Sequence, residues 1–234
     1  LVFGIVGVAY QQKLIAGLDV RGQDFASRLA SLGWAAWFYV RQTFALSEMN
    51  FVYPRRQIDG ATVEAWLPNI AAAAVWGLTW RFRVRWGLFP FAAWTTYLVS
   101  IAPSLGIADV FYWRYSYVGD HYVYQSLPAI LVLPVWLLSR VESLSPIARR
   151  TVYAASASFA CAACIYAHER SYVYQVEERV WVDALRQNPH AFLALSNLGG
   201  TRRLQGRQLE ARQLLEEAVA IETTYYEAWT CLGD

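Results

Sequence analysis

Long apolar runs separated by short arginine-bearing links dominate the first 168 residues. About 20 consecutive apolar residues cross the hydrocarbon core of a bilayer as a helix. The runs at 87–106 and 122–139 are the clearest, and each contains a proline, which membrane helices tolerate. The pattern predicts membrane helices at 29–46, 66–80, 87–106, 122–139 and 149–167. The shorter run at 1–10 is expected to be the end of a truncated helix, so the chain is expected to be a fragment.

The pattern changes after residue 168 to charged, amphipathic helices that contain an internal repeat. Asn197-Leu198-Gly199 recurs 34 residues later as Cys231-Leu232-Gly233. Small residues at helix crossings and glycine at the turn are typical of tetratricopeptide repeats, and at least three such units are needed for a stable array. More repeats are therefore expected beyond residue 234. The predicted structural positions are Trp181, Ala184, Pro189, Leu198, Gly199, Gly206, Ala211, Leu215, Ala218, Trp229, Leu232 and Gly233.

Together the two patterns predict an all-α chain with two regions. Residues 1–168 are expected to be a multi-span transmembrane helix bundle with about five helices and an N-terminal stub. Residues 169–234 are expected to be a truncated tetratricopeptide-repeat solenoid. Arginines crowd the links near 81–85 and 140–150, and the positive-inside rule places both links in the cytoplasm. The loops at 47–65 and 107–121, and everything after residue 167, are then expected on the opposite side.

Composition agrees with a membrane protein and excludes other classes. Hydrophobic residues make up 56% of the chain and charged residues 16%, below the quarter that is usual in soluble domains. The net charge of +2 comes without a basic tract, so nucleic-acid binding has no support. No metal-ligand spacing is present. Cys161 and Cys164 lie in an apolar run, and we interpret them as small residues that pack between helices.

The candidate chemistry lies in the two loops predicted on the same side. Each carries arginine next to tyrosine, as in Tyr53-Pro54-Arg55-Arg56 and Arg114-Tyr115. An arginine fork binds phosphate oxygens bidentately, and a tyrosine offers an apolar ring with a hydroxyl. These residue types fit the phosphate of a lipid-linked donor. The candidate donor-phosphate residues are Arg55, Arg56, Arg114, Tyr115, Tyr117, Asp120 and His121.

Simpler interpretations of these side chains remain open. Arg55 and Arg56 can be a solvated pair on a loop. Arg114 can pair with Asp120 to hold its own loop, without any contact to a substrate. His121 can anchor the start of the helix expected at 122–139.

The order of motifs resembles one family. The chain has WFYV at 37–40, FVYPRRQID at 51–59 and WRYSYVGDHYVYQSLPAI at 113–130, followed by the repeats. In this it resembles the C-terminal half of bacterial relatives of the transmembrane and tetratricopeptide-repeat O-mannosyltransferases. The resemblance implies a bacterial inner-membrane, multi-pass enzyme with its repeats on the extracytoplasmic side. It also implies inverting transfer of a sugar from a polyprenyl-phosphate donor to a protein or glycan acceptor.

The same resemblance implies membrane lipid, a lipid-linked sugar and a protein or peptide as partners, with no bound cofactor. It places the catalytic general base, a carboxylate, upstream of Leu1, so we assign no catalytic residue within the chain. Two other functions remain open. The chain can be a non-enzymatic, membrane-anchored repeat scaffold for protein–protein interaction, or part of a polymerase or ligase that acts on lipid-linked glycans.

Overall fold

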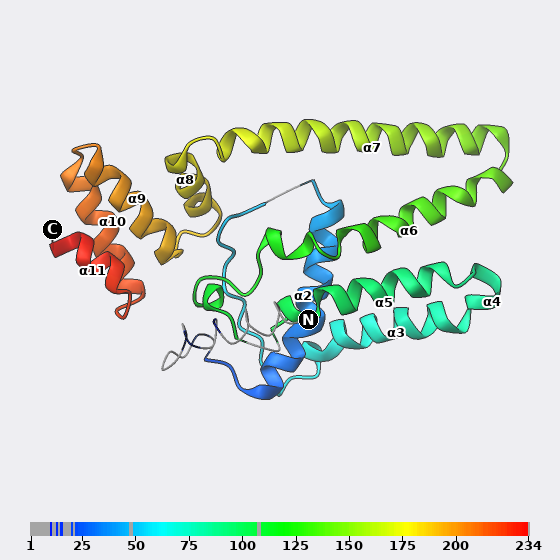
Figure 1. Ribbon diagram of the computed structural model, residues 1–234, viewed down its shortest axis with the longest axis horizontal. Coiled ribbons are helices and arrows are strands. Elements are labelled where there is room, and N and C mark those ends of the chain that lie inside the picture. Colours follow the sequence, from blue (N-terminus) through cyan, green and yellow to red (C-terminus); the bar gives the residue numbers. More distant parts are fainter. Residues whose placement is uncertain are drawn as a thin grey trace. The chain divides into compact units, whose positions relative to one another are not determined.

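The structure is a computed structural model that describes residues 10, 13, 15, 20, 22–46, 49–106 and 109–233. The described residues form helices joined by turns and irregular segments, with no strand among them (Figure 1). The chain divides into two compact units. Unit 1 comprises residues Leu1–Ser47, Gln57–Phe111 and Asp120–Ile165, and unit 2 comprises Glu48–Arg56, Tyr112–Gly119 and Tyr166–Asp234.

Unit 1 is built from helices that follow one another closely in the chain. They are α2 (Phe25–Phe44), η1 (Glu64–Trp66), α3 (Leu67–Arg81), α4 (Arg83–Trp86), α5 (Phe89–Ile101), η2 (Ala102–Ser104), η4 (Asp120–Val123), α6 (Leu127–Ser139), η5 (Val141–Ser143) and α7 (Pro146–Val173). Helices α3 and α5 lie side by side with α4 at their turn, and α5 also packs against α6 (Figure 1). The last residues of α7 belong to unit 2.

A glycine allows α2 and α3 to approach each other closely. Asp24 caps the start of α2 by accepting the Ser27 N–H at 2.8 Å. A Cβ added at Gly33 would lie 2.3 Å from the backbone nitrogen of Asn69 in α3. Side chains then bind main-chain carbonyls across the contact, because Asn69 Nδ2 donates to Ala30 O and Trp37 Nε1 to Pro68 O, both at 2.9 Å.

Buried aromatic side chains of α5 connect it to both neighbouring helices through hydrogen bonds. The Tyr97 hydroxyl donates to Ala36 O at 2.6 Å, and Trp94 Nε1 donates to Ala72 O at 3.2 Å. Tyr97 is completely buried, and this burial raises the pKa of its phenol far above the ordinary value. Aromatic residues with a polar atom usually satisfy that atom when buried, and here the carbonyl partners fix how the helices pack.

The prediction of a multi-span membrane bundle is wrong for the described part of the chain. The chain is helical, but none of its described helices is both long enough and apolar enough to cross a bilayer. The same finding contradicts the expected multi-pass localisation in the bacterial inner membrane, with repeats on the extracytoplasmic side. The prediction that the two loops lie on the same side of a membrane depended on those spans, so it no longer follows.

Two of the apolar runs fail as spans because helix boundaries fall inside them. In the run 87–106, α5 has only 13 residues and gives way to a 3₁₀ turn at Ala102–Ser104, which contains a proline. In the run 122–139, a 3₁₀ turn comes first and α6 also has 13 residues. At 1.5 Å per residue, 13 residues extend about 20 Å, short of the ~30 Å hydrocarbon core. The run 66–80 becomes α3, with 15 residues.

The two longer helices fail on composition. Helix α2 has 20 residues but contains Arg28 and Arg41, and it buries Ser27, Ser31 and Gln42. Helix α7 has 28 residues, is rich in alanine and serine, and carries charged residues near both ends. The stub expected at 1–10 lies outside the described residues except for Tyr10.

Unit 2 contains the last four helices of the chain. They are α8 (Glu177–Gln187), α9 (Phe192–Leu204), α10 (Gln208–Ile221) and α11 (Tyr226–Gly233). Each packs against the next (Figure 1). Gly206 sits between α9 and α10 with a φ of 77°, a left-handed conformation that favours glycine. With only three residues in that connection, α9 and α10 run antiparallel.

The core of unit 2 lies between these helices. Leu215 and Ala218 of α10 are buried against Phe192 and Leu195 of α9. A Cβ added at Gly199 would lie 2.8 Å from Leu215 Cγ, so the small residue allows α10 to approach α9. Trp181, Ala184, Leu198 and Ala211 are also buried, whereas Trp229 is 52% exposed.

Candidate functional site

Two irregular segments far from the C-terminal helices in sequence belong to unit 2, and both carry predicted site residues. They are residues 49–56, which we call the first segment, and Tyr112–Gly119, which we call the second segment. The segments contact each other through Tyr112, whose hydroxyl donates to Phe51 O at 2.7 Å. The loops singled out by sequence therefore lie in the same unit as the C-terminal helices.

The main chain of the first segment is bound by polar side chains of α7 and α8. Met49 O accepts from Arg170 Nη2 at 2.8 Å and from Gln187 Nε2 at 3.0 Å. Asn188, directly after α8, donates from Nδ2 to Val52 O at 3.2 Å. The Met49 N–H donates to the Tyr166 hydroxyl at 3.4 Å. These contacts satisfy the main chain of a segment that has no helix or strand partners of its own.

An ion pair holds the donors of this contact in place. Arg170 Nη1 lies 2.8 Å from Asp183 Oδ2, and both side chains are largely buried. Gln187 Nε2 also donates to Asp183 Oδ2, at 3.1 Å. Burial works against the charge of Arg170, but hydrogen bonds to Asp183 and Tyr174 outweigh it and raise the pKa of the guanidinium. Asp183 thus orients two of the side chains that bind Met49 O.

Apolar contacts also hold the first segment in place. Val52 is 1% exposed and is packed in a cluster with Trp181, Ala184 and Leu198. The Phe51 ring meets the Trp181 ring edge-on, with centroids 5.2 Å apart. Full burial of a valine side chain stabilises by about 1.5–3 kcal/mol, so this contact contributes to folding as well as to position.

The second segment places Arg114 and Tyr115 against α9 and the turn before α11. Arg114 Nη2 donates to Thr224 Oγ1 at 2.9 Å and lies 3.9 Å from Glu222 Oε1, and its guanidinium carbon is 5.4 Å from the Tyr225 ring centroid. The Tyr115 ring lies 5.5 Å from the Phe192 ring and 6.2 Å from the Tyr225 ring. Burial, with a smaller contribution from Glu227, raises the pKa of the Tyr115 phenol.

The structure brings only some of the seven predicted donor-phosphate residues together. The guanidinium of Arg55 lies 5.9 Å from the Phe192 ring, so Arg55 shares that ring with Tyr115. Arg56 is exposed, and Tyr117 is buried in the second segment. Arg114 is only 8% exposed, and its partners in unit 2 are protein groups. The donor-phosphate role of these residues stays a prediction.

The other two predicted residues, Asp120 and His121, belong to unit 1 at the 3₁₀ turn before α6. The His121 ring lies against the Tyr122 ring, with centroids 4.1 Å apart and the ring planes tilted by 43°. Burial lowers the pKa of His121 below its ordinary value, and the nearby Asp120 carboxylate opposes this effect. Cys161 and Cys164, expected to pack between helices, are exposed on α7. Among the described residues, no group of three or more His, Cys, Asp or Glu side chains could hold a metal ion.

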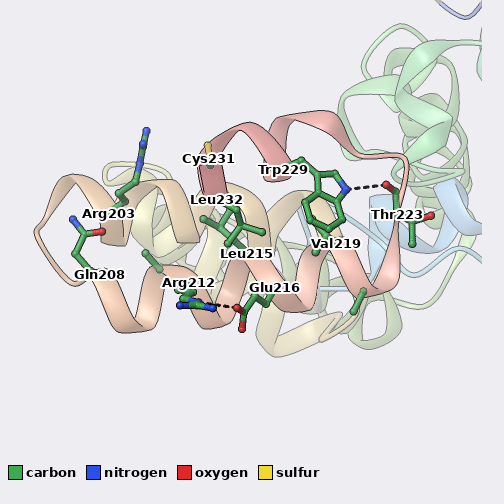
Figure 2. Close-up of a pocket in the computed structure, with 12 residues that line it drawn as sticks. Arg203, Gln208, Arg212, Leu215, Glu216, Val219, Thr223, Trp229, Cys231 and Leu232 are labelled. Carbon is green, nitrogen blue, oxygen red and sulfur yellow. Dashed lines mark hydrogen bonds and ion pairs between the residues drawn. The ribbon is translucent and has the colours of Figure 1, made fainter. Parts of the chain in front are cut away.

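The sequence does not predict the hollows in unit 2, two of which lie along α10 and α11 and beside the first segment. The larger, of about 870 Å³, lies along α10 and α11, where Leu215, Val219 and Leu232 form its apolar side (Figure 2). Trp229 borders it and donates from Nε1 to Thr223 O at 2.9 Å, and an Arg212–Glu216 pair lies on its polar side (Figure 2). The smaller, of about 560 Å³, lies beside the first segment at Tyr53 and Arg186.

Comparison with protein-family models, with curated proteins and with solved structures found no match for this chain.

Proposed function

We propose that α8–α11 are tetratricopeptide-type repeats that act as a protein-interaction module and bind irregular chain segments. The observation that carries this proposal is the way in which the first segment is bound. Three side chains bind its carbonyl oxygens while Val52 fills an apolar site between α8 and α9. Helix surfaces that bind the main chain by polar side chains and one buried side chain have the elements of a peptide-recognition surface.

Burial of repeat-equivalent positions supports the repeat assignment. Ala184 and Ala218 are 34 residues apart, and each is at most 1% exposed. Ala194 and Ala228 have the same separation, and each is completely buried. Small residues recur where helices of neighbouring repeats cross, because the contact leaves no room for larger side chains. A helical array of this kind presents extended surfaces to other chain segments.

Transfer of a sugar from a polyprenyl-phosphate donor stays a prediction from the resemblance. The contacts of Arg114 and Tyr115 within unit 2 favour the interaction function, because they direct these side chains to protein partners.

The proposal is tested by supplying the first segment as a separate peptide. The protein partner is the whole chain carrying Phe51→Ala and Val52→Asp, which removes the two apolar contacts of the covalent segment. A labelled synthetic peptide of residues 47–58 is expected to bind this variant at least tenfold more tightly than the unaltered chain, measured by fluorescence anisotropy. In the unaltered chain the covalent segment competes at an effective concentration on the order of millimolar.

The matched control is the same peptide with V52D, which is expected to bind at least tenfold more weakly because it would bury a charge in the apolar site. Circular dichroism and hydrogen exchange of α8 and α9 establish that the variant chain is folded. A folded variant that does not bind the peptide overturns the proposal. If the double variant unfolds, the milder Val52→Ala chain replaces it in the same assay.

A further inference from the structure

The second segment lies on a surface whose chemistry selects one kind of residue pair. We propose that Phe192, Glu222, Thr224 and Tyr225 form a subsite for an arginine followed by an aromatic residue. The chain fills this subsite with its own Arg114 and Tyr115, and a partner protein with the same pair fills it by exchange. This inference rests on the proposed function and names the partner that the module recognises.

The polar half of the subsite accepts a cationic donor. Thr224 Oγ1 donates its only proton to Glu222 Oε1, so the hydroxyl can only accept from an incoming group. Arg114 Nη2 supplies that hydrogen bond at 2.9 Å, and the Glu222 carboxylate lies 3.9 Å from the same nitrogen. A neutral acceptor in place of the guanidinium would leave Thr224 Oγ1 without a donor and the Glu222 carboxylate without its cationic partner.

The Tyr225 ring favours arginine over lysine at this position. The guanidinium carbon of Arg114 lies 5.4 Å from the centroid of this ring, within the range of a cation–π contact. A guanidinium is planar and less strongly hydrated than an ammonium, so it suits a site that is almost closed to water. The side chain of Arg114 is only 9% exposed. A buried arginine is strongly disfavoured unless it is paired, so Arg114 can be buried here only because it makes these contacts.

The aromatic half of the subsite is already assembled on the helices. The Phe192 and Tyr225 rings contact each other near-perpendicularly, with centroids 5.0 Å apart. The Tyr115 ring joins both, so the receiving side offers two rings to one incoming ring. Aromatic pairs in such geometry contribute about 0.5–1.5 kcal/mol beyond the area they bury. The subsite therefore favours an aromatic residue after the arginine, because that ring can contact both the Phe192 and the Tyr225 ring.

One acceptor near the subsite is left without a hydrogen bond by the second segment. Glu227 Oε2 is buried and has no hydrogen-bond partner, and the charge of Glu227 raises the pKa of both Tyr115 and Tyr225. An unsatisfied buried acceptor costs about 1–3 kcal/mol. A partner segment with an additional donor can satisfy it, which gives an exchanging partner an interaction that the chain's own segment lacks.

The test opens the subsite in the whole chain with Arg114→Met and Tyr115→Leu, which keep apolar volume and remove the pair. A labelled peptide of residues 110–120 is expected to bind this variant at least tenfold more tightly than the unaltered chain, by fluorescence anisotropy. The same peptide with R114A is expected to lose at least tenfold in affinity. With R114K it is expected to keep part of the affinity, because the charge remains without the planar fork.

Substitutions in the protein that receives the peptide distinguish specific binding at the subsite from nonspecific binding. Glu222→Gln in the opened chain is expected to weaken binding of the peptide several-fold, whereas Glu217→Gln, at an exposed position of α10, is expected to leave binding unchanged. Equal binding of the R114A and unaltered peptides to a folded chain overturns the inference. If the peptide of residues 47–58 binds and that of residues 110–120 does not, the subsite proposal is wrong and the proposed function is retained. If neither binds, both fall.

Discussion

The two units achieve close helix packing in different ways. In unit 2, apolar side chains such as Leu215 are buried between helices, and the small residue opposite gives them room. In unit 1, backbone meets backbone at Gly33, and buried Tyr97 and Trp94 bind carbonyls of neighbouring helices. Large apolar residues are exposed in both units, such as Ile70 at 58% and Val135 at 63% in unit 1 and Leu204 at 86% in unit 2. The difference between the units therefore lies in how the buried contacts are made and not in how completely apolar residues are covered.

The comparison is tested most severely by Gly33→Ala in unit 1. The added Cβ would lie 2.3–2.7 Å from backbone atoms of residues 68 and 69, and a backbone cannot move aside as a side-chain end can. We expect unit 1 to lose about 3 kcal/mol of unfolding free energy, the upper part of the range for overpacking. The measurement is hydrogen exchange of α2 and α3 with increasing denaturant.

Gly77→Ala is the matched control within the same unit. An added Cβ at Gly77 on α3 meets nothing within 4 Å, and alanine is a better helix former. This change is expected to stabilise by up to about 1 kcal/mol. Equal effects of the two substitutions would show that α2 and α3 do not approach through Gly33.

A smaller effect of the same kind is expected in unit 2 from Gly199→Ala. Its Cβ would lie 2.8 Å from Leu215 Cγ, a side chain that is itself fully buried, so α9 and α10 must shift slightly. We expect a loss of about 1–2 kcal/mol after the helix-propensity gain is counted. Thermal unfolding and hydrogen exchange of α9 and α10 provide the measurement.

Gly200→Ala serves as the neighbouring control, because an added Cβ there meets nothing within 4 Å. It is expected to change stability in the opposite direction, by up to about 1 kcal/mol. If Gly199→Ala also stabilises, unit 2 does not depend on a small residue at this crossing.

The smallest expected effect is the pH dependence that His121 gives to unit 1. Burial lowers its pKa in the folded chain below the ordinary value of 6.5, so the unfolded chain binds more protons in this range. The contribution to stability is full above pH 6.5 and is lost as pH falls through the folded pKa. Denaturation of unit 1 between pH 7.5 and 5, followed by hydrogen exchange, should show this loss, and His121→Gln should reduce it. An unchanged pH profile in that variant would assign the effect to other groups.

The helices can be predicted from the sequence, but the residues that contact the two loops cannot. The apolar and small-residue spacing after residue 168 predicts helices, and the end of α7 and helices α8–α11 occupy most of that region. The apolar runs before it also became helices, but boundaries such as those of α5 and α6 depend on turns that a hydropathy count does not register. The sequence also selects the arginine and tyrosine side chains of the two loops as candidate site residues. Their partners were not predictable, because Arg114 and Thr224 are 110 residues apart and Val52 and Asn188 136 apart.

The binding of carbonyl oxygens in the first segment has a consequence for how this protein can change over evolution. Every residue type carries a carbonyl oxygen, so the hydrogen bonds at Met49 and Val52 specify the course of the chain and not the identity of its side chains. Residue 49 can therefore change in sequence while its position is kept, whereas Phe51, Val52 and the Arg114–Tyr115 pair contact their partners through their side chains. Under the proposed interaction function, a partner segment would share a few fixed residues in an otherwise variable sequence.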